Sequence, residues 1–227
     1  MEQQRIFGGN KMRNKIKYFL LSLLDLIYRK KCYFCKTSKY SLKMCPKCYE
    51  TLTFSDFRAN RIIDCVDIYS SGIYEKNLQK LIRGLKYHNQ KELAYYLAKF
   101  MYEYFLNLEF DKSFQVVPTP LHPNRQKRRK YNHMELVAIE FCNISGCKYN
   151  PNLIKRVKDT KPQYSLSRTQ RLENLNGAFV VDKTADLGMP VLLLDDICTT
   201  GTTFEEMIKI LKQADINDIT CLASSNP

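Results

Sequence analysis

The chain has 227 residues and a mass of 26.7 kDa, and it carries a formal net charge of +13. Its length fits one α/β domain of ordinary size with a small additional module. With 44% hydrophobic and 12% aromatic residues and few Gly and Pro, the composition is globular, which excludes a low-complexity chain. The excess of positive charge favours an acidic partner, although many basic proteins bind nothing acidic specifically.

The first 48 residues carry much of this charge, with 12 Lys or Arg against two acids. Residues 1–15 are expected to be a disordered basic N-terminus. The apolar run 16–28 contains Asp25, is too short to span a bilayer and is not followed by an Ala-x-Ala cleavage site. It is therefore interpreted as an amphipathic helix rather than a signal peptide, and the chain as cytoplasmic. The predicted division places this helix and a cysteine module in 16–58 and the main domain in 59–227.

Four of the nine cysteines form two Cys-x-x-Cys pairs, Cys32 with Cys35 and Cys45 with Cys48. In a reducing cytosol such pairs are more often metal ligands than disulfides. Two pairs complete a closed tetrahedral site, which predicts a structural Zn²⁺ that supplies the folding energy of a short segment. A thioredoxin-like redox pair would need only one motif, and four cysteines alone do not exclude an iron–sulfur centre. Four zinc-bound thiolates would leave a net charge of about +11.

Apolar periodicity predicts alternating strands and helices along the rest of the chain. The expected strands are 62–70, 114–117, 177–181, 191–194 and 218–223, and the expected helices are 78–85, 92–106, 132–144 and one that starts near Phe204. The run 191–194 lacks the polar alternation of a half-exposed strand, which predicts a central strand of a mostly parallel sheet. The sequence therefore predicts an α/β fold.

Two basic segments interrupt these elements. Residues 125–130 hold five positive charges and no acid, shortly after the strand 114–117 ends at Pro118-Thr119-Pro120. A charge run is usually a solvated face, but at a strand end it also suits the neutralisation of a pyrophosphate. Residues 156–171 show almost no apolar periodicity, which predicts a mobile loop with a short helix. Such a loop is either a lid over a phosphate site or a plain linker.

Asp195 and Asp196 stand at the carboxyl end of the strand 191–194, where parallel sheets bind ligands. Their carboxylates would accept hydrogen bonds from two ribose hydroxyls or hold Mg²⁺ through its waters. The N–H groups and hydroxyls of 199–203, at the start of a helix, suit a phosphate, and Gly201 permits positive φ. A lone Asp-Asp would usually be a solvated turn with a Thr N-cap. Here strand, acids, loop and helix occur in the order that a phosphorylated ribose requires.

This run resembles the phosphoribosyl-pyrophosphate (PRPP) motif of type I phosphoribosyltransferases, in which four apolar residues precede Asp-Asp and Thr-Gly-x-Thr. With the four cysteines, it also resembles the ComF family, which pairs an N-terminal zinc module with a type I phosphoribosyltransferase-like domain and is linked to DNA uptake in natural competence. The match covers nearly the whole chain after about residue 16. Its other residues are 81–87, 117–122, Arg129, Tyr131, Asn132, Arg156, Asp159, Thr160, Gln163, Arg171, Asn174, Ala178 and Phe179.

The resemblance implies a type I phosphoribosyltransferase-like core, with a central, mostly parallel sheet flanked by helices, in addition to the zinc module. It also implies that Asp195 and Asp196 are catalytic and hold the ribose hydroxyls of PRPP, which would bring Mg²⁺ with it. The other implied roles are a 5′-phosphate loop of Thr199, Thr200, Gly201, Thr202 and Thr203, a pyrophosphate turn with Thr119, Pro120, Arg128 and Arg129, and a flexible loop with Arg156, Lys158, Gln163 and Arg171.

The chain departs from the family pattern at two positions. Lys130 stands where the family usually has the Gly of Arg-Gly-Phe-Asn, and His133 stands where Gln is common. A Gly that is needed for positive φ, or for close approach of a pyrophosphate, would be poorly replaced by Lys.

Two functions of different classes follow. The first is a protein that binds PRPP or another phosphorylated ribose and acts in competence, handling single-stranded DNA with basic segments on phosphates and Tyr or Phe stacked on bases. The alternative is an active phosphoribosyltransferase that uses PRPP, for which the sequence specifies no acceptor. Other competence proteins are expected partners, and DNA uptake would bring this cytoplasmic protein to the inner face of the membrane.

Overall fold

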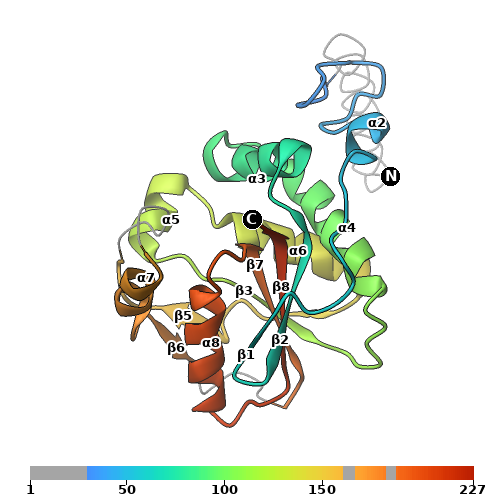
Figure 1. The fold of residues 1–227 in the computed structure, drawn as a ribbon. Helices are drawn as coiled ribbons and strands as arrows, with labels where there is room; N and C mark the ends of the chain where they lie inside the picture. The colour runs from blue at the N-terminus through green and yellow to red at the C-terminus, as the bar shows by residue number, and fades with distance from the viewer. Residues whose placement is uncertain (1–29, 161–166, 183–187) are drawn as a thin grey trace, which may run out of the picture. The chain divides into compact units, whose positions relative to one another are not determined.

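The computed structural model describes residues 30–160, 167–182 and 188–227 (Figure 1). The chain divides into two compact units between Tyr49 and Glu50. The N-terminus predicted for 1–15, the helix predicted for 16–28 and the loop residue Gln163 lie outside the described residues. The domain boundary placed after residue 58 stays a prediction. In the described ranges, no helix is both long enough and apolar enough to cross a membrane.

The described part of the first unit consists of turns and one short helix. Cys32 opens a tight turn, because its carbonyl accepts a hydrogen bond from the Lys36 N–H at 2.9 Å. Helix α2 (Pro46–Tyr49) follows, with Pro at its first position, where the missing N–H costs no helical hydrogen bond. Both Cys-x-x-Cys pairs are therefore held by local backbone geometry.

The second unit is built on a six-stranded sheet in the order β1-β2-β8-β7-β3-β4. Only β1 pairs antiparallel with its neighbour, so the mostly parallel central sheet expected from the sequence is confirmed. The strands are β1 (Arg61–Ile63), β2 (Val66–Ile73), β3 (Gln115–Pro118), β4 (Lys148–Tyr149), β7 (Val191–Ile197) and β8 (Ile219–Asn226), and a separate antiparallel pair is formed by β5 (Ile154–Arg156) and β6 (Phe179–Val181).

Helices cover both faces of the sheet (Figure 1). They are α3 (Lys76–Tyr87), α4 (Leu93–Leu106), α5 (Pro123–Arg129), α6 (His133–Ser145), α7 (Arg168–Leu175) and α8 (Thr202–Lys212). On one face, Phe204, Met207 and Leu211 of α8 share a buried cluster with Leu193 and Ala223. On the other, α4 and α6 contact the central strands. Burying each such side chain contributes roughly 1.5–3 kcal/mol, so the central strand β7 is fixed from both sides.

The single strand expected over 62–70 is wrong. The chain forms a hairpin there, because it reverses at Asp64 and Cys65, whose φ angles are 49° and 59°. A two-residue turn with both φ angles positive matches the twist of a hairpin, and it is usually made by Asn-Gly or Asp-Gly. Cys in place of Gly hides this signal in the sequence.

Two helices also differ from expectation. The helix expected from about Phe204 begins two residues earlier, at Thr202, and Gly201 precedes it with a φ of 80°. The basic run 125–130, interpreted as a turn or a solvated face, lies mostly on α5. Pro123 occupies the first turn of α5, where its fixed φ favours helix initiation.

Candidate functional site

Asp195 and Asp196 lie inside β7, because the pairing of this strand with β8 continues as far as Ile197. Successive side chains of a strand point to opposite faces of a sheet. Leu193 belongs to the cluster formed with α8, which places Asp195 on that face. Asp196 lies on the other face, where it contacts α6. The two adjacent acids therefore have different surroundings.

Asp196 is buried and held by two side chains from different helices. Its Oδ2 lies 2.7 Å from Nζ of Lys86 on α3 and 2.5 Å from Nε2 of His133 on α6. Its carbonyl oxygen accepts hydrogen bonds from the hydroxyls of Ser224 and Ser225. Burial acts to raise the pKa of Asp196, but the Lys86 charge and the His133 hydrogen bond outweigh it and keep the pKa well below its usual range. Asp196 is thus ionised and fixed.

The two partners of Asp196 carry one positive charge between them. Burial lowers the pKa of His133 by more than the carboxylate raises it, so the ring is neutral. In Lys86, by contrast, attraction to Asp196 outweighs burial and raises the pKa. A neutral His133 that donates from Nε2 has an acceptor at Nδ1, and this buried atom has no hydrogen-bond partner within the described residues.

Asp195 has no such counter-ion among the residues that the structure describes. Its Oδ1 accepts a hydrogen bond from the N–H of Asp196 at 2.9 Å, and among the described residues it takes part in no ion pair. Burial, and then repulsion from the Asp196 carboxylate, raise the pKa of Asp195 to about 7. Of the two acids, Asp195 is therefore the one whose charge a ligand has to balance.

The segment from Thr199 to Thr203 follows β7, and its last two residues form the start of α8. Its Thr200 and Thr202 hydroxyl oxygens lie 3.2 Å apart, and Thr202 is almost fully buried. A Cβ at Gly201 would lie 2.8 Å from the Ile63 side chain, so this position needs Gly for space as well as for its positive φ. Gly201 is the N-cap of this 11-residue helix and offers no side chain to cap its first N–H groups.

Two arginines contact this loop from elsewhere in the chain. Arg171 of α7 donates a hydrogen bond of 2.5 Å from Nη1 to the Thr199 hydroxyl. Arg61 of β1 donates one of 3.4 Å from Nη2 to the Thr199 carbonyl. Arg171 was predicted at the site from the resemblance, whereas Arg61 was not recognised. The structure thus gathers positive charge beside the loop that was predicted to bind phosphate.

The predicted pyrophosphate turn starts where β3 ends. Thr119 is buried, and its N–H and hydroxyl both donate to the Leu194 carbonyl, at 2.8 and 3.0 Å. Pro120 is buried too, while Arg129 is half-buried at the end of α5 and the Arg128 side chain lies outside the described part. Thr119 therefore fixes the turn directly beside the acid pair.

Lys130 adopts the left-handed conformation expected of a Gly at this position. Its φ is 68° and its ψ is −10°, and it terminates α5. Lys130 therefore takes a backbone conformation that a Gly would adopt without strain. A non-glycine residue in this region costs roughly 1–2 kcal/mol, so the surrounding structure holds Lys130 there against its own preference.

The residues predicted for a flexible loop occupy three separate places. Arg156 is buried in β5, where Nη2 donates to the Thr160 hydroxyl at 2.5 Å, while its buried Nε has no partner within the described residues. Burial and the nearby Arg125 lower the pKa of Arg156 to about 10. Lys158 donates to the Asn176 carbonyl at 3.3 Å, and Arg171 reaches Thr199. Arg156 and Arg171 thus come close to the site, and the placement of Gln163 is not described.

Sequence reasoning missed the role of Lys86. The residue lies in the segment 81–87 that resembles ComF, but no role was assigned to it. Helical periodicity places Lys86 beside the buried Ile82 and Leu85 at the last turn of α3, which is unusual for a lysine and was an available signal. Its partner across the sheet was not deducible, since the two residues are 110 positions apart.

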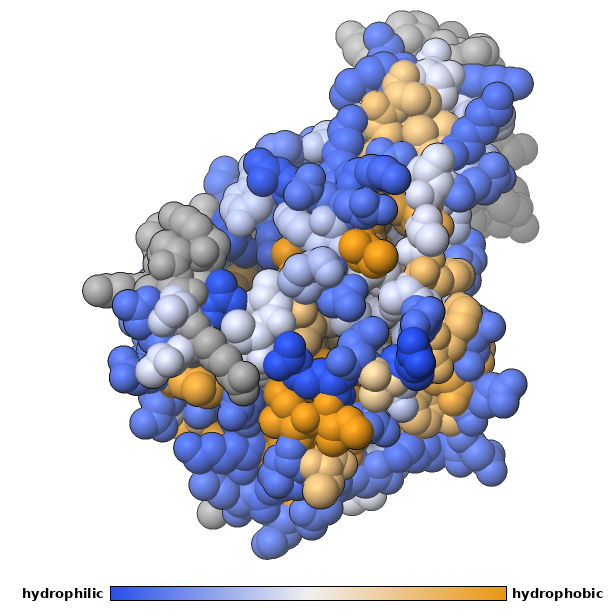
Figure 2. Space-filling model, in the orientation of Figure 1, coloured by the Kyte–Doolittle hydropathy of each residue, from blue (hydrophilic) through white to orange (hydrophobic). Residues whose placement is uncertain are grey.

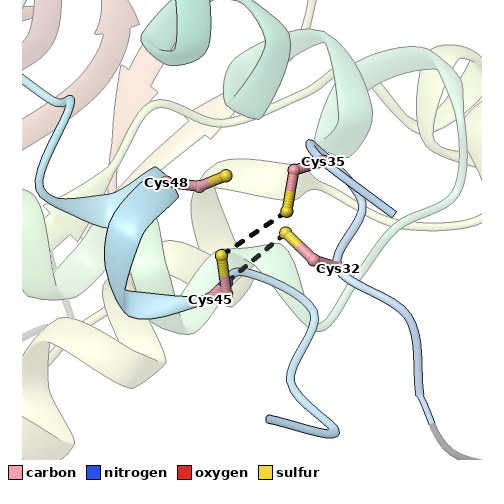
Figure 3. Close-up of side chains that lie close together, drawn as sticks. All are labelled: Cys32, Cys35, Cys45 and Cys48. Atoms are coloured by element: carbon pink, nitrogen blue, oxygen red, sulfur yellow. Dashed lines mark hydrogen bonds between the residues drawn. The ribbon is translucent and has the colours of Figure 1, made fainter. Parts of the chain in front are cut away.

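The four cysteines form a compact cluster in the first unit (Figure 3). All four sulfur atoms lie within 4.8 Å of one another, and those of Cys35 and Cys45 are 3.6 Å apart. In a tetrahedral site with Zn–S bonds of about 2.3 Å, the sulfurs stand about 3.8 Å apart, so the cluster fits a bound zinc. Burial would raise the pKa of Cys32, but backbone N–H donors outweigh it and lower the pKa to about 6. A metal would thus be held by Cys32, Cys35, Cys45 and Cys48.

Comparison with solved structures finds proteins of low sequence identity. The glutamine PRPP amidotransferase from B. subtilis is 18% identical, with 59% of this chain and 26% of that chain covered and a TM-score of 0.40. Adenine phosphoribosyltransferase from Thermoanaerobacter pseudethanolicus is 12% identical, with coverage of 74% and 95% and a TM-score of 0.36. No family model matches the chain.

Comparison with curated proteins finds closer relatives. DNA utilization protein YhgH of Salmonella typhimurium is 26% identical over 75% of this chain and 78% of its own length. Competence protein ComFC of Streptococcus pneumoniae is 26% identical over 77% of each chain. Competence protein F of Haemophilus influenzae is 32% identical over 65% of this chain and 67% of its own length. With this last similarity and the motifs found in its sequence, the chain belongs to the ComF family.

Proposed function

We propose that this ComF-family protein binds a phosphorylated ribose, PRPP with Mg²⁺, at the carboxyl ends of β3 and β7, and acts in natural competence by handling incoming single-stranded DNA. The ribose site is supported most by the position of Asp195. Its carboxylate stands directly before the Thr199–Thr203 loop and the start of α8, and within the described residues no cation pairs with it. This arrangement suits a ligand with hydroxyl donors next to a phosphate.

Each part of the ligand has a counterpart among the described residues. Asp195 would accept hydrogen bonds from ribose hydroxyls, and Oδ1 of Asp196 is left for a second one while Oδ2 is held by Lys86 and His133. The N–H groups at the start of α8 would bind the 5′-phosphate. Arg171, already bonded to Thr199, would balance its charge.

The pyrophosphate would lie between the Thr119 turn and the buried Arg156. The unpartnered Nε of Arg156 supports this placement, because a buried guanidinium nitrogen without an acceptor is costly until an anion supplies one. Bound Mg²⁺ would neutralise part of the pyrophosphate charge, and Asp195 offers a carboxylate to its water shell.

The role in DNA handling is supported by charge and by the relatives. The chain carries a net charge of +13, which favours a polyanionic partner. Its curated relatives are named for competence and for DNA utilization. We therefore extend this role to the present chain.

Calorimetric titration of the whole protein with PRPP and Mg²⁺ tests the ribose site. We expect binding by the native protein and at least about a tenfold loss for Asp195→Asn, which removes a charged hydrogen-bond acceptor. Asp111→Asn is the matched control, because Asp111 is exposed and precedes the amino end of β3. Equal affinity in the native protein and Asp195→Asn, or no binding by the native protein, contradicts the site.

Binding of a fluorescent oligo-dT, measured by anisotropy at several salt concentrations, tests the DNA-handling role. Neutralised phosphates release counter-ions, so the logarithm of the affinity should fall linearly with the logarithm of the salt concentration. Salt-independent binding contradicts an electrostatic contact, and absence of binding at low salt contradicts the role itself.

The second candidate function, phosphoribosyl transfer to an unidentified nucleobase-like acceptor, is favoured by one observation. Lys130 adopts the left-handed backbone that a Gly would adopt there, which favours a turn of the kind that the resemblance assigns to pyrophosphate binding. Release of pyrophosphate from PRPP in the presence of single purine or pyrimidine bases is the test. If no base stimulates release although PRPP binds, the protein is a binding protein rather than a transferase.

A further inference from the structure

Tyr87, the last residue of α3, lies on the surface next to a buried part of the site. It is 59% exposed, while the preceding Lys86 forms the buried pair with Asp196. Two guanidinium groups lie over its ring, with Cζ of Arg83 at 5.7 Å and Cζ of Arg129 at 5.6 Å from the ring centre. We call Tyr87, Arg83 and Arg129 the tyrosine platform. Cations at this range are attracted by the electron-rich ring face.

A second tyrosine joins the two segments that make up the platform. The Tyr131 hydroxyl donates a hydrogen bond of 2.5 Å to the Leu85 carbonyl at the end of α3. Nζ of Lys91 lies 4.9 Å from the centre of the Tyr131 ring. Because Tyr131 follows α5 directly, its bond brings the basic end of α5 beside the last turn of α3.

These two segments contain no acidic residue. Residues 76–91 and 120–134 each hold five Lys or Arg and neither Asp nor Glu. Figure 2 shows mostly hydrophilic residues over α3. Lys86 is neutralised by Asp196, but the other cations of the two segments repel one another where they lie close together, and a polyanion would offset this repulsion. The cations are Lys76, Lys80, Arg83, Lys86 and Lys91 in the first segment, and Arg125, Lys127, Arg128, Arg129 and Lys130 in the second.

We propose that the tyrosine platform is a stacking site for one base of single-stranded nucleic acid, with the flanking phosphates on Arg83, Arg129 and Lys91. An exposed ring that already attracts guanidinium groups to its face offers the two things that a single strand requires, a flat face on which a planar group stacks and positive charge for the backbone. Bases in a duplex present no free face, so the partner is single-stranded. The inference rests on the proposed handling of DNA and assigns it a location on α3 and α5.

Anisotropy with a labelled oligo-dT measures the contribution of the ring. Stacking on an aromatic side chain is worth about 1–3 kcal/mol per base, so Tyr87→Ala should weaken binding about 5- to 150-fold. Tyr87→Phe keeps the ring and should stay within about twofold of the native protein. Tyr95→Ala is the control, since Tyr95 of α4 is also exposed, at 45%, and is expected to leave the affinity unchanged.

An abasic oligomer separates stacking from charge. Without bases, native protein and Tyr87→Ala should bind equally. Arg83→Gln and Arg129→Gln should each lower the slope of log affinity against log salt concentration by about one, the amount that one phosphate contact contributes. This should hold for either oligomer. Arg58→Gln is the matched control, because Arg58 is exposed and bonded to Asp56.

The outcomes distinguish this inference from the function on which it rests. If the native protein binds oligo-dT and Tyr87→Ala binds it equally well, the platform is wrong while DNA handling stands. If the native protein does not bind oligo-dT, both are overturned. Circular dichroism checks the fold of each variant, and titration with PRPP and Mg²⁺ is added for Tyr87→Ala. Loss of PRPP binding together with DNA binding in Tyr87→Ala means that the ring acts through Lys86 and Asp196, which also overturns the platform.

Discussion

Nζ of Lys86, in the last turn of α3, lies 2.7 Å from Oδ2 of Asp196 in β7. Both side chains are largely buried, with 14% and 12% of their surfaces exposed. The pair therefore ties the end of α3 to the central strand β7. It also gives the two acids different charge environments, since Asp196 has a permanent counter-ion and Asp195 has none among the described residues.

Replacement of Lys86 should destabilise the protein strongly. Lys86→Met keeps the bulk of the side chain but leaves Asp196 buried with only the neutral His133 as partner. Removing one partner of a buried ion pair costs about 3–5 kcal/mol, so we expect a loss of this size in urea unfolding monitored by circular dichroism.

Lys76→Met is the control for this change. Lys76 lies on the same helix, but its side chain is 82% exposed and its contact with Glu75 is 3.7 Å long. Its replacement should change the free energy of unfolding by less than about 0.5 kcal/mol. A similar small effect for Lys86→Met would mean that Asp196 is protonated or solvated, contrary to its lowered pKa.

The raised pKa of Asp195 should make the ligand-free protein less stable as pH rises. In the unfolded chain this carboxyl ionises near pH 4, whereas in the folded protein its pKa is about 7. Between these values the unfolded state has already released the proton that the folded state retains, so rising pH favours unfolding. One proton limits the slope to about 1.4 kcal/mol per pH unit.

Asp195→Asn should remove this dependence. We expect the stability of this variant, measured by urea unfolding, to rise relative to the native protein between about pH 4 and pH 7 and to stay level above pH 7. Asp111→Asn, which changes an exposed acid, should parallel the native protein at each pH. If Asp195→Asn also parallels it, the carboxyl of Asp195 is not perturbed by its burial.

Lys130→Gly should stabilise the protein. Gly removes the steric cost of a φ of 68° but adds conformational freedom to the unfolded chain. The difference between these effects predicts a gain of about 0.5–1 kcal/mol in urea unfolding. Lys127→Gly, within α5, should instead lose about 1 kcal/mol, because Gly is a poor helix former. Equal losses in both variants would show that Lys130 makes contacts that outweigh its strain.

Much of the fold was predictable because its signals are local. The run 191–194 and the segment 199–203 carry their own pattern of apolar, acidic and small residues, and the structure places them within β7 and at the start of α8. The hairpin at Asp64 was missed, since a turn with Cys in its second position lacks the usual Gly.

The partners within the site were not predictable. Lys86 and His133 reach Asp196 only after the chain has folded, and no pattern in one sequence specifies which buried charges meet. The same holds for Arg171 and Thr199. Sequence reasoning thus located the acids and the loop, while the long-range contacts that set their charge states came from the structure.

Removal of one cysteine of the cluster should abolish metal binding and unfold the first unit. Four sulfurs within 4.8 Å suit one Zn²⁺, and a segment this short has little core to hold it without metal. We expect about one zinc per chain by elemental analysis of the native protein, and loss of it in Cys48→Ser.

Cys65→Ser is the control, because Cys65 is exposed, lies in the β1–β2 turn and belongs to the second unit. Because the second unit has its own core, Cys48→Ser should still bind PRPP with Mg²⁺ if the proposed site is correct. A native protein without stoichiometric metal whose first unit nevertheless resists proteolysis would contradict the zinc site.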